Sequence, residues 1–121
     1  MNCSEMNCSE MTDFEINCEV LALMEPDVAH MQLSADQKSF FHCGYDGNGF
    51  YETTIPEYCS SWADAGTVIQ SNQISLDAIY DGGPRWLSFA GDDGEFRHTD
   101  TNPLRAAMIV FLMMRETEND K

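Results

Sequence analysis

The residues best suited to chemistry are the arginines. Four of the six basic residues are arginines, and all four lie in the last third of the chain: Arg85, Arg97, Arg105 and Arg115. Arg85 precedes Trp86, and Arg97 precedes His98. A guanidinium group is a planar fork that fits a phosphate or carboxylate, and an aromatic ring can stack on a base. This combination is typical of a site for a small nucleotide-like anion.

We predict a pocket between the strand ends and the N-terminus of the last helix. The expected ligand-binding residues are Arg97, His98, Arg105, Trp86, Tyr58, Trp62 and Asn102. Asn102 and Arg105 belong to this set because helix N-termini favour anions. A structural explanation stands beside it: the arginines neutralise nearby carboxylates and the tryptophans lie in the core. Any single arginine is more often structural, since surface ion pairs are common.

The sequence contains no known catalytic motif. It has no G-x-S-x-G elbow, no phosphate-binding glycine loop and no H-E-x-x-H. The three histidines and five cysteines lack metal-ligand spacing. We therefore expect no enzymatic activity, no metal site and no cofactor. A motif search of this kind does not detect an active site assembled from residues dispersed along the chain.

The chain is strongly acidic, with 21 acidic residues and a formal net charge of −15. Such a field repels nucleic-acid phosphates and membrane surfaces, so neither is an expected partner. The acidity has two explanations, solubility or imitation of nucleic-acid charge. No basic segment followed by an apolar segment opens the chain, so we expect a cytoplasmic protein with reduced thiols.

The N-terminus repeats one polar pentapeptide, because Met1–Glu5 is followed at once by the same residues in 6–10. A repeated polar segment buries little surface. We expect residues 1–11 to form a flexible leader and residues 12–121 a single domain.

Three helices are predicted. Thr12 and Glu15 have the capping-box pattern, and the helix that follows should end near Met24, before Pro26. Ser60 or Ser61 can cap a second helix that runs to about Ser71. Gly66 within it indicates either a short helix or close packing of another backbone.

The third helix is expected to be the centre of the core. Asn102 is a good N-cap, and Pro103 suits the first helical position. The residues from Leu104 to Met114 are apolar on almost every side, so the helix must be covered on most sides. The run is too short to span a membrane, which needs roughly 20 apolar residues.

The segments between the helices favour strands. Aromatic and β-branched residues in 39–43 and 50–55 flank a turn at Asp46–Gly49, which predicts a hairpin. Segments 74–79, 85–90 and 95–98 are separated by glycine-rich turns. The fold class is therefore α+β, with one small antiparallel sheet of about four to five strands packed against three helices.

Three segments carry a family resemblance: residues 13–17, residues 58–64 with Gly66 and Ile69, and residues 102–108. In this order they resemble the NinX-like family, small proteins of temperate phages and prophages. The resemblance covers nearly all of the chain after Met11. It implies an accessory phage protein in the bacterial cytoplasm, and it brings no assigned catalytic residues.

Two functions are compatible with these observations. The first is a non-enzymatic protein that acts against host defence by sequestering a small nucleotide-type signal. The alternative is an acidic mimic of nucleic acid that inhibits a basic host protein, such as a nuclease, a restriction factor or a repressor. A homo-oligomer is expected for the first, because small domains form deep pockets most easily between subunits.

Overall fold

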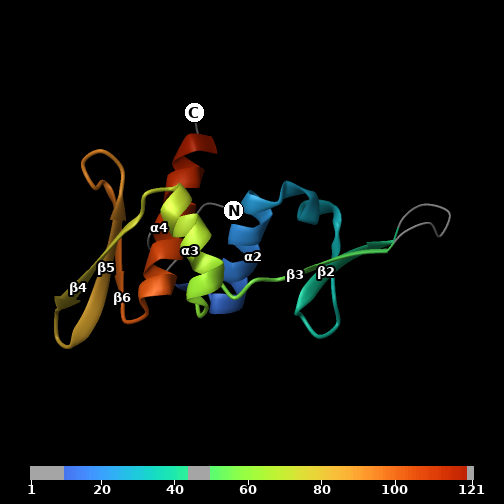
Figure 1. Ribbon diagram of the computed structural model, residues 1–121, viewed down its shortest axis with the longest axis horizontal. Coiled ribbons are helices and arrows are strands. Elements are labelled where there is room, and N and C mark those ends of the chain that lie inside the picture. The colour runs from blue at the N-terminus through green and yellow to red at the C-terminus, as the bar shows by residue number, and fades with distance from the viewer. Residues whose placement is uncertain (1–9, 44–49, 120–121) are drawn as a thin grey trace.

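In the computed structural model, residues 10–43 and 50–119 are described. Within these ranges, the α-helices α2, α3 and α4 occupy the middle of the molecule, and a small sheet lies on each side of them (Figure 1). The α+β class is therefore confirmed.

The first helix, α2 (Asp13–Met24), begins with the predicted capping box. The Thr12 hydroxyl accepts a hydrogen bond from the Glu15 amide, and the Glu15 carboxylate accepts one from the Thr12 amide. The helix ends before Pro26, as expected, and a short 3-10 helix, η1 (Pro26–His30), follows.

The first sheet has the order β1-β2-β3, with β1 at Gln32–Leu33, β2 at Ser39–Cys43 and β3 at Phe50–Thr54. β2 and β3 form the predicted antiparallel hairpin, in which Ser39 is opposite Thr54 and Cys43 is opposite Phe50. The predicted turn at Asp46–Gly49 lies outside the described residues.

The second helix, α3 (Trp62–Ser71), is capped by Ser61, whose hydroxyl accepts from the Asp64 amide at 3.3 Å. Gly66 lies inside it with no atom within 4 Å of the position that a Cβ would occupy. Neither explanation for Gly66 holds: the helix continues through it, and no other backbone packs there.

The second sheet has the order β4-β5-β6, with β4 at Ser75–Tyr80, β5 at Pro84–Ala90 and β6 at Phe96–Asp100. Alternate residues point to opposite faces of a sheet. The face that carries Ser88, Ala90 and His98 is buried, and α4 packs against this sheet.

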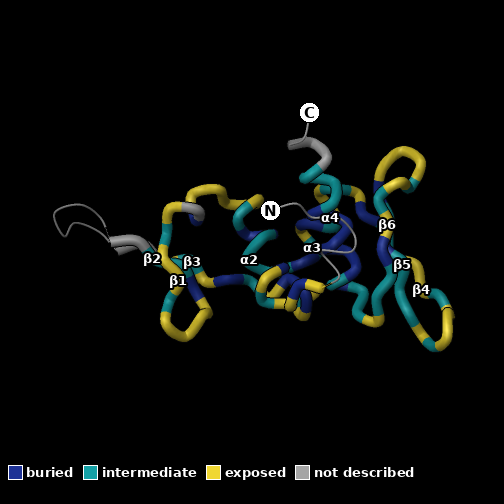
Figure 2. Tube along the Cα trace, turned by 180° about the vertical axis from the view of Figure 1, so that it is seen from behind, coloured by how far each residue is buried: buried dark blue, intermediate teal, exposed yellow. Residues whose placement is uncertain are grey.

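The last helix, α4 (Pro103–Asn119), packs on α2, α3 and the β4-β5-β6 sheet. Every side chain from Ala106 to Leu112 is buried, so the apolar surface on all sides of the helix is covered (Figure 2). The first sheet packs against η1 instead.

The prediction of a small sheet of about four to five strands is only roughly met, because the described residues contain two three-stranded antiparallel sheets instead of one sheet. The connection between the two strand groups contains α3, and α3 packs on α4. The chain therefore crosses the helical layer before the second group begins (Figure 1). Of the expected leader, residues 1–9 lie outside the described residues, whereas Met11 is 8% exposed and belongs to the core.

Replacing Gly66 with alanine should raise the free energy of unfolding by about 0.5–1 kcal/mol, because alanine loses less backbone entropy in a helix and meets no neighbour here. Urea titration measures the change. Gly82→Ala is the matched control. The added Cβ also meets no neighbouring atom, but the φ of +72° at this position is unfavourable for alanine, so the free energy of unfolding should fall by about 1 kcal/mol. Equal effects of the two substitutions would contradict this account.

Candidate functional site

A network of polar side chains joins the starts of α2 and α4 to the turn before α3. The side-chain Nδ2 of Asn102 donates to the backbone carbonyl of Cys59 at 2.6 Å, and the backbone N–H of Cys59 donates to the side-chain oxygen of Asn17 at 3.1 Å. The other end of the Asn102 side chain caps α4 by accepting from Leu104 and Arg105 amides. We call these residues, together with Arg105 and its partners, the polar clamp.

Arg105 is the centre of the polar clamp. Its Nε donates to Asp100 at 3.1 Å, its Nη1 donates to Asp13 at 2.7 Å, and its Nη2 donates to the carbonyl of Met11. The side chain is only 15% exposed. The anions beside this guanidinium group are thus carboxylates of the chain itself.

Three other residues of the predicted pocket lie near the clamp. His98 is 6% exposed, with its Nε2 3.8 Å from the Asp100 carboxylate. Trp86 is half-buried and lies opposite Asp100 in the sheet. Tyr58 is buried next to Cys59 in sequence, and burial raises the pKa of its hydroxyl.

The remaining predicted residues have other surroundings. The Arg97 guanidinium donates to the carbonyl of Gly94 at 2.9 Å in an exposed position, and Trp62 is 58% exposed at the start of α3. Arg85 donates to the Thr99 carbonyl, and Arg115 donates to Asn72 and stacks on a phenylalanine ring. The structure therefore places Asn102 and Arg105 in the polar clamp and His98, Trp86 and Tyr58 near it, whereas the four arginines donate to different acceptors.

Cys59 is held by the clamp and is fully buried. Burial, reinforced by the charge of Asp13, raises the pKa of its thiol to about 12. A thiol in this state is a poor nucleophile, because the thiolate is the reactive form.

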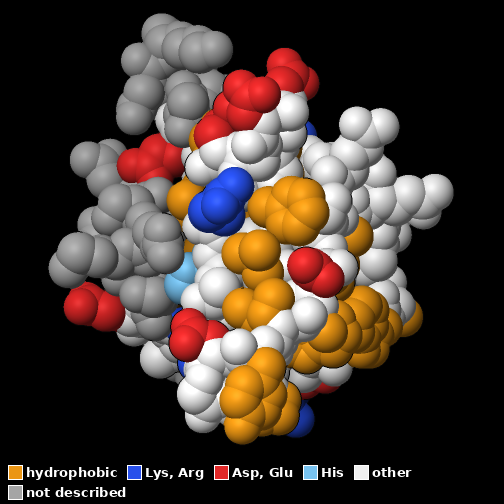
Figure 3. Space-filling view, turned by 90° about the vertical axis from the view of Figure 1, so that its left-hand side faces the viewer, with side chains coloured by type: hydrophobic (Ala, Val, Ile, Leu, Met, Phe, Trp, Pro, Cys, Tyr) orange, Lys and Arg blue, Asp and Glu red, His pale blue; other side chains and the backbone are white. Residues whose placement is uncertain are grey.

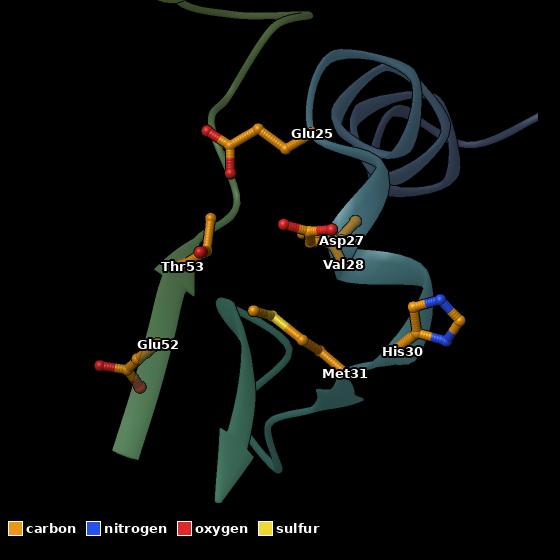
Figure 4. A pocket seen from close by; sticks show the side chains of 7 residues that line it. All are labelled: Glu25, Asp27, Val28, His30, Met31, Glu52 and Thr53. Carbon is orange, nitrogen blue, oxygen red and sulfur yellow. The ribbon is translucent and has the colours of Figure 1, made fainter. Parts of the chain in front are cut away.

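One cleft, of about 510 Å³, lies between η1 and β3. In Figure 4 the side chains of Asp27 and Met31 point into it, and Glu25 reaches across it toward the chain that follows β3. Val28 and Thr53 also line it. The side chain of His30 points away from the cavity (Figure 4). The cleft thus combines carboxylates with an apolar wall.

Two further clefts are formed by the same half of the chain. One, of about 570 Å³, is lined by Asp13, Glu57 and Asp64 and also by Lys38. The other, of about 270 Å³, is lined by Glu25, Asp64 and Tyr58. None of the three clefts is lined by an arginine.

Sequence reasoning missed these acidic clefts. Glu25 and Asp27 flank the proline that ends α2, and only the approach of β3 makes them neighbours of a cavity. No spacing in the sequence indicates this contact. Among the described residues, no helix has the length and apolarity to span a bilayer, and no three His, Cys, Asp or Glu side chains are grouped to hold a metal ion.

Comparison with known proteins gives one result. The sequence profile of the family described as "Bacteriophage P22, NinX" matches residues 7–115. The chain belongs to the NinX family. No curated protein and no solved structure matches it significantly.

The segments that carry the NinX resemblance contain most of the polar clamp. Asp13 and Asn17 lie in the first, Cys59 in the second, and Asn102 and Arg105 in the third. Their contacts account for them as residues that hold the fold together. Binding of an anion by the predicted set of residues stays a prediction.

Replacing Arg105 with methionine should lower the free energy of unfolding by about 3 kcal/mol, because it leaves Asp100 partly buried without its guanidinium partner. Arg105→Lys should recover only part of the loss, since an ammonium group cannot reproduce the planar fork. Urea denaturation is the measurement.

Arg97→Ala is the matched control for this experiment. It also removes a guanidinium group, but one that is exposed and bonded to a single carbonyl, so the change should stay below about 0.5 kcal/mol. If both arginines had the same effect, the clamp would not be a main source of stability.

Alkylation of the native protein at pH 8 should modify Cys18 well before Cys59. Cys18 is half-buried, whereas only about 1 in 10⁴ of the Cys59 thiols is ionised at this pH. Peptide mapping by mass spectrometry measures the two rates. In urea both should react quickly, and equal rates in the native protein would contradict the burial of Cys59.

Proposed function

We propose that this phage protein acts by binding, without catalysis, and that it captures a basic segment of a host protein in the acidic clefts beside η1 and β3. The carboxylates at these clefts are the observation that carries the proposal. Inhibition of a nuclease, a restriction factor or a repressor is the corresponding role against host defence.

The acidity is unevenly distributed along the chain. Residues 1–71 contain twelve acidic residues and one basic residue, Lys38, whereas residues 72–121 contain nine acidic and five basic residues. The first part of the chain builds the clefts. A strongly negative surface increases the association rate of a positively charged partner.

The 510 Å³ cleft has the chemistry to hold a lysine or arginine side chain. Glu25 and Asp27 provide charged acceptors, while Val28 and Met31 provide apolar surface for the methylene groups of such a side chain. Cavities of this size are within the usual range for ligand sites, about 300–1,000 Å³.

Sequestration of a nucleotide-type signal has less support. It requires several arginines around one space, whereas Arg105 is bonded to two carboxylates and Arg97 to a turn carbonyl. Native mass spectrometry of protein from phage-producing cells distinguishes the two: a retained nucleotide favours sequestration, and a basic protein released by salt favours capture.

The sharper test compares two charge-matched double variants. Glu25→Gln/Asp27→Asn removes two negative charges at the cleft, and Asp92→Asn/Asp93→Asn removes two from an exposed turn of the other sheet. With the captured host protein purified, affinity measured by calorimetry should fall about tenfold or more for the first variant. The second should stay within about threefold of the original protein.

Equal losses for the two variants would assign the binding to net charge and remove the cleft from the proposal. Binding that does not weaken with added salt would also contradict the proposal, because at 0.1 M salt the attraction between exposed charges more than about 10 Å apart is largely screened.

A further inference from the structure

The β4-β5-β6 sheet has a second face, opposite α4, which we call the outer face. Strand alternation and register assign to it three apolar and three charged residues: Ile79, Leu87, Phe89, Asp77, Arg85 and Arg97. The proposed host-protein site does not include this face.

The apolar residues of the outer face take no part in the core. Ile79, Leu87 and Phe89 are half-buried but do not belong to the core cluster, whereas Leu76 and Phe96 on the inner face pack against it. Seen from this side, hydrophobic side chains gather in the middle of the surface, with charged groups beside them (Figure 3). An apolar group rimmed by charges is typical of a protein interaction site.

The charges of the outer face have both signs. Asp77 is directly opposite Leu87 in the sheet, and Arg85 is two residues from Leu87 along β5. One carboxylate and one guanidinium therefore flank the same leucine from two directions. Arg97 lies on the same face, so the outer face carries two arginines and one aspartate, although the net charge of the whole chain is −15.

We propose that the outer face binds the outer face of a second copy of this chain through a two-fold axis. In the register of β4 and β5, Leu87 and Ile79 lie on one diagonal of a four-residue group, and Asp77 and Arg85 lie on the other. A two-fold axis that lies between the two faces and runs along the diagonal from Leu87 to Ile79 exchanges the positions of Asp77 and Arg85. Each carboxylate then meets the guanidinium of the partner's Arg85, and Leu87 packs on the partner's Leu87. The strands of the two sheets cross steeply in this arrangement, as they do in orthogonal sheet packing.

Charge complementarity selects a second copy over a foreign protein. A two-fold interface places the same patch on both sides, so a face with neighbouring opposite charges pairs with itself. A purely acidic partner would leave Asp77 facing a like charge, and a purely basic one would do the same to Arg85 and Arg97.

Sedimentation equilibrium of the full chain tests the proposal. At about 100 μM, where a dimer of micromolar affinity is mostly associated, the protein should be a dimer. Leu87→Asp should make it a monomer, and Asp77→Arg and Arg85→Asp should each weaken the dimer about tenfold or more. The double variant Asp77→Arg/Arg85→Asp should return within about threefold of the original affinity, because the pair is restored with reversed signs.

Tyr80→Ser is the matched control, since this side chain is 82% exposed at the end of β4 but does not lie on the outer face. It should leave the dimer unchanged. A monomer at this concentration overturns the proposal, and so does a double variant that fails to recover. The exchange of charges gives a result even if Leu87→Asp does not fold, and circular dichroism identifies that case.

Discussion

The structure depends on one partly buried guanidinium group. Arg105 binds Asp13 and the carbonyl of Met11 at the start of α2, 92 and 94 residues away in sequence, and it also binds Asp100 at the end of β6. The start of α2 and the end of β6 therefore meet at the first turn of α4. Asn102 joins the turn before α3 to the start of α4 by its hydrogen bond to the carbonyl of Cys59. The apolar packing of α4 provides most of the buried surface, and these polar contacts fix the positions in which the helices and the second sheet dock on it.

This arrangement limits what the same residues can do for a ligand. A guanidinium group at a helix N-terminus is a natural anion site, but two carboxylates of the chain already occupy the directions in which its N–H groups point. An incoming phosphate would have to displace a short bond to Asp13 or Asp100. The chemistry that made Arg105 a candidate ligand residue is the same chemistry that makes it a structural one.

Local signals in the sequence predict the elements well and their assembly less well. The capping box of α2, the Asn102 cap of α4 and the β2-β3 hairpin depend on residues within a few positions of one another. The division into two sheets depends instead on where α3 carries the chain. Two of the three hydrogen-bond partners of Arg105, Asp13 and Met11, are 92 and 94 residues away in sequence. The cleft beside Glu25 requires β3 to approach η1, which no local pattern encodes.

The two proposed surfaces differ in their response to salt, and this difference follows from where the charges lie. Capture of a basic segment is an attraction between opposite charges and weakens as ions screen it. Pairing of two outer faces brings together two chains of −15 each, so the long-range repulsion is relieved by the same ions while apolar contact at Leu87 remains. The 510 Å³ cleft lies beside η1, across the helical layer from the β4-β5-β6 sheet, so a dimer would leave it open (Figure 1). A single protein could therefore associate with itself through one end and bind a partner at the other.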